Sequence, residues 1–308
     1  MPLLTLTSDI GEQDYLVGAV KGRLLRINPQ FQIIDITHKL SPFNYPQAAY
    51  VCRNAIKNFP PDTFHIVLVN LFDKRPDHLL LIQHNNQYIG CADNGLITMV
   101  LEEVPEKIIA LPLKASEKKN TLYCASVFAK AFQEILDGKT MDEVGDSSVS
   151  IETKNPLRPL LGPKYIEGQI IFIDNFENVI INITKDEFEE QRRGRSFKIV
   201  FKRDEIIEKI SETYADVHES EKLALFNSAN TLSASAAVFI FVIPCAKRVA
   251  AAAAIIKNIT KFDKNIPDHT SILMFLISLF DAPSRFWIVV LPFNISSSIS
   301  CEVCQKKR

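Results

Sequence analysis

The chain has 308 residues, a formal net charge of −1 at pH 7 and 47% hydrophobic residues. This length suffices for two domains with a sizeable core, and the near-neutral charge excludes the basic footprint of a nucleic-acid-binding protein. Six scattered cysteines are typical of reduced cytosolic thiols. The first residues lack a signal-peptide pattern, and no apolar run reaches the ~18 residues of a membrane span. We therefore expect a cytoplasmic protein without nucleic-acid or membrane partners.

The first part of the chain alternates between short apolar runs and amphipathic segments. The apolar runs, which predict strands, span residues 3–7, 31–36 and 64–69. Helical periodicity lies between them, at residues 13–27 and 45–58. Because strands and helices alternate, the pattern favours an α/β fold with a mostly parallel sheet and covering helices.

The following segments predict a hairpin and two further helices. Residues 79–83 and 87–91 flank a polar turn, which indicates a pair of adjacent strands. A turn at 93–95 precedes a short helical pattern at 96–103. A longer helix is predicted at 121–137, and the glycine that follows it is suited to end a helix.

A polar, proline-rich linker at residues 146–166 separates a first α/β domain, residues 1–150, from a second domain, residues 166–230. Short strand patterns with tight turns fill the second domain, which favours a smaller antiparallel, barrel-like β fold. Its predicted strands lie at residues 168–174, 179–183, 196–201 and 222–226. We interpret the charged run 189–195 as a solvated turn.

The last segment, residues 231–308, differs from the rest of the chain. All ten glycines lie at or before Gly194, although average usage predicts several in a segment of this length. We interpret these residues as an atypical tail, explained either by a shifted reading frame or by poor order. Cys301 and Cys304 form a lone pair without the about four ligands that zinc needs, so we predict no metal site.

Two carboxylates, Asp9 and Asp14, follow the first predicted strand and precede the first predicted helix. Open α/β folds bind ligands at the carboxyl ends of their strands, which favours a binding role for this loop. An aspartate in such a loop also commonly caps the following helix. The two residues therefore have a functional and a structural interpretation.

Further motifs accompany these carboxylates, and together they resemble the S-adenosylmethionine (SAM) hydroxide adenosyltransferase family, the relatives of the SAM-dependent fluorinase and chlorinase. The matching segments are residues 7–14, 27–29, 34–38, 41–43, 93–96 and 174–179. The resemblance covers about residues 3–229. It implies hydrolysis of SAM to adenosine and methionine without a metal or separate cofactor, because SAM is the substrate.

The resemblance also implies roles for individual residues. Asp9 would bind the ribose diol, and Asp14 would pair with the methionine ammonium group. In the second domain, Asp174 would contact that amine, Phe176 would lie on the adenine, and Asn178 would bond the adenine edge. A glutamate follows Phe176 where the family has a glycine. Glutamate rarely adopts the left-handed backbone conformation that glycine allows.

An aromatic residue, Phe43, matches the position that covers the substrate in the halogenase relatives. Cys124 matches a serine that donates a hydrogen bond to fluoride in the fluorinase, and a thiol is a weaker donor than a hydroxyl. Both residues are therefore candidates for substrate contact.

The chain departs from the family pattern at the positions that hold and activate water. Hydroxide-transferring members carry an Asp, an Arg and a His there, and the matching positions here carry Asn70, Arg75 and Tyr123. Neither an amide nor a largely protonated phenol is a good proton acceptor at neutral pH. Asp73 is the only carboxylate in the immediate loop, and we assign it as the candidate base.

Our first hypothesis is a SAM hydrolase in which water or hydroxide attacks the ribose C5′ atom. The second is a catalytically weak or inactive SAM- or adenosine-binding protein, because Asn70 replaces the family's carboxylate. The third is a SAM-dependent halogenase-like enzyme. The resemblance implies a homotrimer whose sites lie between the first domain of one subunit and the second domain of the next.

Overall fold

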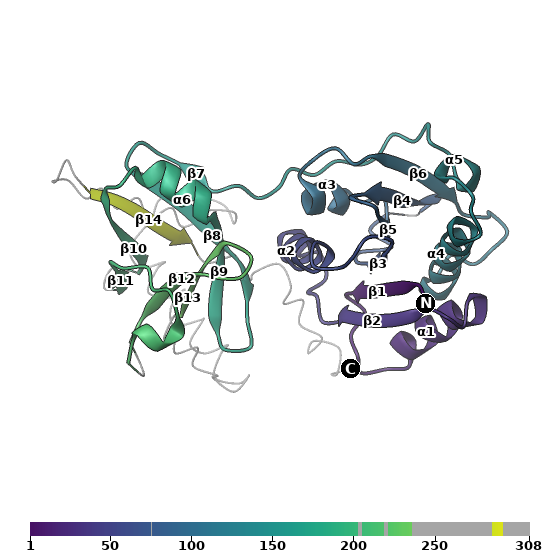
Figure 1. Cartoon of the computed structure of the whole chain (residues 1–308), viewed down its shortest axis with the longest axis horizontal. Coiled ribbons are helices and arrows are strands. Elements are labelled where there is room, and N and C mark those ends of the chain that lie inside the picture. The colour runs from purple at the N-terminus through teal and green to yellow at the C-terminus, as the bar shows by residue number, and fades with distance from the viewer. Residues whose placement is uncertain (75, 203–204, 219–220, 236–284, 292–308) are drawn as a thin grey trace, which may run out of the picture. The chain divides into compact units, whose positions relative to one another are not determined.

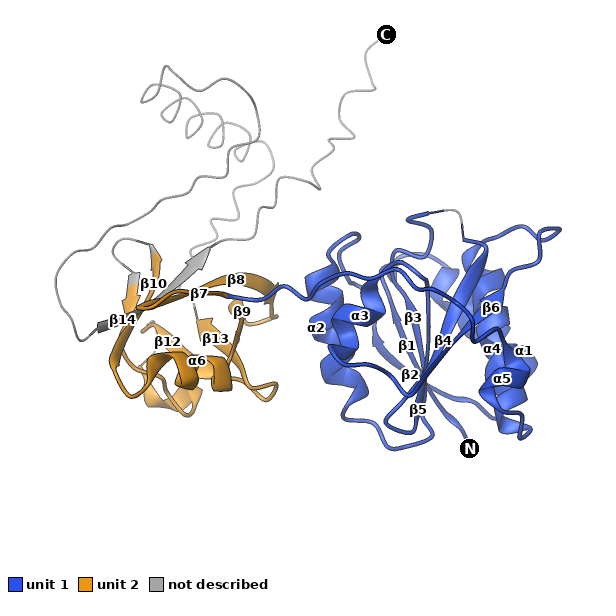
Figure 2. Ribbon diagram, turned by 90° about the horizontal axis from the view of Figure 1, so that it is seen from above, with its two compact units in different colours: residues 1–159, 293–308 blue, residues 160–292 orange. Residues whose placement is uncertain are grey.

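The structure is a computed structural model that describes residues 1–308 except 75, 203–204, 219–220, 236–284 and 292–308. The described chain divides after Pro159 into two compact units, which are blue and orange in Figure 2. Among the described residues, no helix combines the length and apolar character needed to cross a membrane.

A six-stranded sheet forms the centre of the first unit. Its strands are β1 (Leu3–Ser8), β2 (Gln32–Thr37), β3 (Phe64–Leu68), β4 (His78–His84), β5 (Gln87–Cys91) and β6 (Lys107–Pro112). They lie in the order β2-β1-β3-β5-β4-β6, and β4 alone runs antiparallel to its two neighbours. The expected mostly parallel sheet and the expected hairpin of β4 and β5 are therefore confirmed.

Helices cover both faces of this sheet. They are α1 (Leu16–Ile27), α2 (Tyr45–Ile56), α3 (Leu96–Leu101), α4 (Thr121–Leu136) and α5 (Met141–Val144). Figure 1 shows α1, α4 and α5 on one face and α2 and α3 on the other, and each group packs around its own hydrophobic cluster. Strand β4 is buried on both faces, because Leu79 and Leu81 join one cluster and Leu80 and Ile82 join the other.

Asparagine side chains fix the starts of α2 and α4. The Asn44 side chain accepts a hydrogen bond from the backbone N–H of Gln47 at the start of α2. The Asn120 side chain does the same for Tyr123 at the start of α4. Such caps satisfy backbone donors that have no partner inside the helix, typically stabilising it by ~1 kcal/mol.

A second sheet forms the second unit. Its strands are β7 (Leu160–Leu161), β8 (Tyr165–Ile173), β9 (Asn178–Thr184), β10 (Ser196–Lys202), β11 (Glu205–Ile207), β12 (Leu223–Phe226), β13 (Thr231–Ser235) and β14 (Arg285–Leu291). The described pairings are antiparallel except those of β14, which lies parallel to β8 and β10. The N–H of Ser211 donates to the carbonyl of Ala224 (2.7 Å), so the segment after β11 curls back beside β12. The expected small antiparallel β unit is confirmed, with one parallel strand added.

Two elements of the second unit differ from expectation. Helix α6 (Lys185–Arg192) includes most of the charged run interpreted as a turn, and a capping box of Thr184 and Glu187 starts it. Only Arg193 and Gly194, with φ of 52° and 73°, form the left-handed turn that ends it. Strand β13 pairs with β9 and β12, which carries the sheet past the expected boundary at residue 230.

A short 3-10 helix, η1 (Tyr214–Asp216), lies between β11 and β12. Apart from β13 and β14, the expected atypical tail lies outside the described residues.

Candidate functional site

Asp9 and Asn70 lie together at the carboxyl edge of the first sheet. Each follows one of two adjacent parallel strands, β1 and β3. The backbone N–H of Asn70 donates to Oδ2 of Asp9 at 2.8 Å. Burial raises the pKa of the Asp9 carboxyl, and this hydrogen bond opposes the rise. Asp9 is thus a half-buried carboxylate with one oxygen held by the protein.

The backbone beside this carboxylate is strained at two non-glycine residues. Asn70 has φ 46° and Phe43 has φ 61°, both in the left-handed region. The Asn70 Oδ1 atom accepts a hydrogen bond from the N–H of Phe43 at 2.8 Å, which joins the two residues. The Asn94 side chain also supports this turn, because its amide nitrogen donates to the carbonyls of Val69 and Asn70. Strain of this kind costs about 1–3 kcal/mol per residue and clusters at functional sites.

Tyr45 and Asp73 complete the group. The Tyr45 hydroxyl donates to Oδ2 of Asp73 at 3.0 Å, and the N–H of Asp73 donates to the carbonyl of Asn70 at 3.2 Å. Burial, together with the Asp73 carboxylate, raises the pKa of Tyr45 to about 12. The phenol therefore stays protonated at neutral pH and acts as a donor to Asp73. The Lys154 ammonium lies 4.3 Å from the centroid of the Tyr45 ring.

The Asn70 amide nitrogen is an unused donor in this group. Asn70 is 6% exposed, and among the described residues its Nδ2 atom has no hydrogen-bond partner. It lies beside the Tyr45 hydroxyl without reaching hydrogen-bond geometry. A buried donor left unpaired costs about 1–3 kcal/mol. An acceptor on a bound ligand would remove this cost.

Of the remaining residues predicted for the first unit, none shares a hydrogen bond with this group in the described structure. Asp14 is exposed, and its Oδ1 accepts from the N–H of Leu16 at 2.8 Å, which is the structural role at the start of α1. The Tyr123 hydroxyl accepts from the N–H of Lys114 at 3.0 Å. Cys124 is fully buried in the core, and burial raises the pKa of its thiol to about 11. Arg75 lies outside the described residues.

The residues predicted in the second unit form the tight turn between β8 and β9. Oδ1 of Asp174 accepts from the N–H groups of Phe176 and Asn178, and Oδ2 accepts from the Asn178 side chain. The Phe176 side chain is 86% exposed, whereas Asn178 is buried. Glu177 has φ 65°, so it adopts the left-handed conformation despite replacing a glycine. The turn thus holds the Phe176 ring exposed.

Sequence reasoning missed Tyr45. It lies on the first turn of α2, two residues after Phe43, where it looks like an ordinary helix residue. The signal that could have found it is positional. Because α2 begins at the same sheet edge where β1 and β3 end, a polar side chain on its first turn can reach the end of β3.

The grouped side chains offer a coherent set of chemical functions. Asp9 and Asp73 supply carboxylate acceptors, and the Asn70 amide supplies a donor. Phe43 adds an aromatic ring that is 69% exposed at the same edge. Among the described residues, no group of three or more His, Cys, Asp or Glu side chains could hold a metal ion. The arrangement suits a polar organic ligand with hydroxyl groups and a flat or cationic part.

Comparison with known proteins gives matches over both units. A family model described as SAM hydroxide adenosyltransferase N-terminal domain matches residues 4–145, and the corresponding C-terminal domain model matches residues 168–236. A protein of Methanocaldococcus jannaschii named (R)-S-adenosyl-L-methionine hydrolase is 34% identical over 61% of this chain and 69% of its own length. A fluorinase of Nocardia brasiliensis is 23% identical over 71% of this chain and 84% of its own length.

Solved structures agree with these matches. The crystal structure of an uncharacterized conserved protein from Thermotoga maritima has a TM-score of 0.65 and 27% sequence identity, covering 75% of this chain and 91% of that protein. A conserved hypothetical protein from Thermus thermophilus has a TM-score of 0.57 at 23% identity, covering 76% of this chain and 91% of that protein. The second likeness supports the fold alone.

Proposed function

The chain belongs to the SAM hydroxide adenosyltransferase family, and on this premise we propose that it hydrolyses SAM to adenosine and methionine. The observation that carries the proposal is the grouping of Asp9, Asn70 and Asp73 at one sheet edge, linked by hydrogen bonds. Asp9 can bind the ribose of a nucleoside, and Asp73 can accept a proton at the same sheet edge. Neither a metal nor a separate cofactor takes part in the proposed reaction.

The proposed reaction is a displacement at the ribose C5′ atom. The oxygen of a water molecule forms a bond to C5′ as the bond from C5′ to sulfur breaks. The sulfur keeps the electron pair, so methionine leaves as a neutral thioether and needs no proton. The water proton passes to a base. Holding water and SAM in line can supply about 7–11 kcal/mol of the barrier reduction, and a base typically adds about 10²–10⁴-fold.

Asp73 is the proposed base. Its Oδ2 atom is held by the Tyr45 hydroxyl, which leaves Oδ1 for the attacking water. Asn70 cannot accept the proton, but its unused amide N–H can donate to the water oxygen or to a ribose hydroxyl. We retain Arg75 and Tyr123 as proposed contributors, because they match the family's water-binding positions.

The proposed substrate contacts follow the family pattern. Asp9 accepts hydrogen bonds from the ribose diol, and Phe43 covers the substrate. Asp14 pairs with the methionine ammonium group in the loop before α1. Cys124 contributes through the packing of the wall beside Tyr123, because its thiol is buried.

We further propose a homotrimer, in which Asp174, Phe176 and Asn178 of one subunit complete the site of a neighbouring subunit. The exposed Phe176 ring is the feature that supports this proposal, because a large bare aromatic side chain suits a partner surface or a stacked base. Light scattering of the purified protein tests it, and a mass of one chain contradicts it.

A SAM- or adenosine-binding protein with little or no turnover is the second candidate. It is favoured by one observation, the amide of Asn70 where the family carries a carboxylate. Incubation of the purified full chain with SAM, followed by chromatography, distinguishes the two. Adenosine formed above the uncatalysed rate supports the hydrolase, whereas calorimetric SAM binding without adenosine supports the binder. Chloride-dependent 5′-chloro-5′-deoxyadenosine would instead identify a halogenase-like enzyme.

A further inference from the structure

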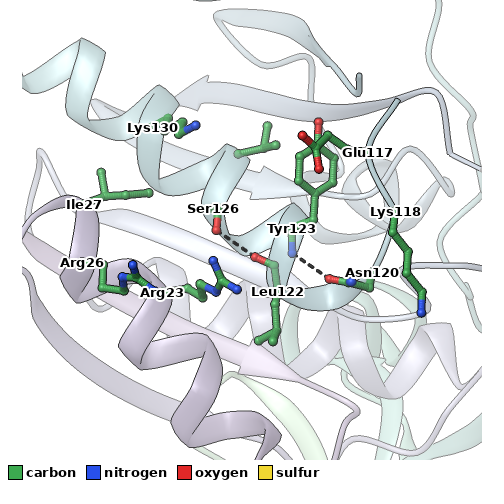
Figure 3. A pocket seen from close by; sticks show the side chains of 11 residues that line it. Arg23, Arg26, Ile27, Glu117, Lys118, Asn120, Leu122, Tyr123, Ser126 and Lys130 are labelled. Atoms are coloured by element: carbon green, nitrogen blue, oxygen red, sulfur yellow. Dashed lines mark hydrogen bonds between the residues drawn. The ribbon is translucent and has the colours of Figure 1, made fainter. Parts of the chain in front are cut away.

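A cavity of about 500 Å³ lies between α1 and α4 in the first unit (Figure 3). Among the residues of the proposed reaction, only Tyr123 lines it. Its volume lies within the about 300–1,000 Å³ that small-molecule sites occupy. The proposed hydrolysis gives this cavity no role.

Cationic side chains dominate the lining. Arg23 and Arg26 come from α1, Lys130 from α4 and Lys118 from the loop before it, and Glu117 is the one carboxylate in the lining. In the part of the chain that the structure describes, these four cations have no hydrogen-bond or ion-pair partner. They are therefore available to a ligand.

Several other cations in this unit are neutralised by a carboxylate, whereas within the described structure the four cations of the cavity are not. Cationic side chains elsewhere form ion pairs, as in Lys21–Asp35, Lys39–Glu12 and Lys107–Asp142. Unpaired positive charges gathered around one hollow attract anions and raise their local concentration. The positive charge of this cavity is thus not neutralised by the protein itself.

The spacing of the two arginines favours a phosphate group. Arg23 and Arg26 are three residues apart on a helix, so they lie on the same face of α1. Figure 3 shows the Arg23 side chain extending from α1 toward Leu122 of α4, with Arg26 beside it on the same helix. A guanidinium group presents parallel N–H donors that match two oxygens of a phosphate.

The remaining lining is partly apolar. Ile27, Leu122, Tyr123 and Val127 are partly buried and pack against the hydrophobic core behind the cavity. An inorganic ion would leave this wall in contact with water. A ligand with an apolar or aromatic part beside its charged group would cover it.

We propose that this cavity binds a small organic phosphate. The phosphate group lies between Arg23 and Arg26, with Lys130 and Lys118 adding positive charge, and the organic part packs on Leu122 and Val127. The proposed phosphate contacts are separate from the Asp9 group, and Tyr123 is the one lining residue that is also a proposed contributor to the hydrolysis.

Calorimetric titration of the full-length protein with phenyl phosphate tests the proposal. Inorganic phosphate and phenol serve as probes that carry only the charge or only the ring. Phenyl phosphate should bind more tightly than either. The double variant R23Q/R26Q should weaken its binding at least about tenfold, the factor that corresponds to one lost charge-assisted hydrogen bond.

Lys57→Gln is the matched control. This exposed cation lies at the end of α2 and does not line the cavity. Its affinity for phenyl phosphate should equal that of the unaltered protein. Absence of binding at millimolar phenyl phosphate overturns the proposal, and so does equal weakening in Lys57→Gln and the double variant. Because Lys130 is exposed, Lys130→Gln provides a second variant if the double variant fails to fold.

Discussion

Asn70 connects the parts of the candidate site through three different atoms. Its backbone N–H binds Asp9, its Oδ1 binds the N–H of Phe43, and its carbonyl accepts from Asp73. Such a residue is hard to replace, because each atom positions another functional group. Asparagine at this position makes these three contacts but accepts no proton, and the nearby Asp73 carboxylate lies three residues further along the chain.

The charge of Asp9 is the first residue-scale prediction. Asp9→Asn keeps an oxygen that can accept from the N–H of Asn70, but it removes the negative charge offered to the ribose hydroxyls. A hydrogen bond to a charged group contributes about 1.5–3 kcal/mol, so SAM affinity measured by calorimetry should fall about 10- to 100-fold. The control is Asp62→Asn, which removes a carboxylate at the opposite end of β3. Equal affinity of both variants would remove Asp9 from the site.

His65 gives a second prediction, on stability. It is buried in β3, and its Nδ1 atom lies 2.7 Å from the Thr5 hydroxyl. Burial lowers the pKa of His65 from 6.5 to about 4, although the nearby Gln87 side chain opposes the change. Below pH 6.5 the unfolded chain therefore binds a proton that the folded protein does not, and stability falls until about pH 4.

This loss should reach about 2 kcal/mol at pH 5, from 1.36 kcal/mol per pKa unit. Urea unfolding at pH 7 and pH 5 measures it. The variant His65→Gln has no imidazole to protonate, so its stability should change less between the two pH values. An identical change in both proteins would show that His65 does not titrate in this way.

At the scale of elements, the first turn of α2 carries Tyr45, whose hydroxyl holds the proposed base Asp73 in the loop after β3. Asp73→Asn should lower kcat by about 10²–10⁴-fold with little change in KM, since it removes the proposed base but no substrate contact. Tyr45→Phe should lower kcat less, because it removes only the hydrogen bond that holds Asp73. Steady-state kinetics with SAM measures both variants.

Tyr88→Phe is the control for the tyrosine variant, since Tyr88 pairs with Phe64 at the other end of β3. Its kcat should not change. A kcat of Asp73→Asn equal to that of the unaltered protein would assign the proton to another acceptor.

The sequence predicted most elements of the first unit, for physical reasons that the structure makes plain. The predicted apolar runs correspond to strands β1, β2 and β3. The caps Asn44 and Asn120 directly precede the segments with helical periodicity. Helix α6 was missed because its residues are mostly charged and only Phe188 is buried, so it has little apolar periodicity.

The candidate site was predictable only in part. Asp9 and Asn70 follow apolar strands, and the meeting of strand ends at one edge brings them together. The contact of Tyr45 with Asp73 depends on the left-handed turn at Asn70. No local sequence pattern predicts this turn. Cys124 was predicted as a substrate contact from a motif match, and the structure places it on the buried face of α4.

At the scale of the whole molecule, both units carry part of the family pattern. The first unit presents Asp9, Asn70 and Asp73 at one sheet edge, and the second presents Phe176 on a turn held by Asp174. Family models match each unit separately. We therefore expect full SAM affinity to require both units, with the chemistry carried by the first.

The most direct test of this account follows the oxygen atom. SAM is incubated with the purified full chain in water enriched in ¹⁸O, and the adenosine product is analysed by mass spectrometry. Attack of water at C5′ predicts adenosine with one ¹⁸O in its 5′-hydroxyl group, formed at a rate that falls in the Asp73→Asn variant. Adenosine without the label, or no adenosine above the uncatalysed rate, would contradict the central claim.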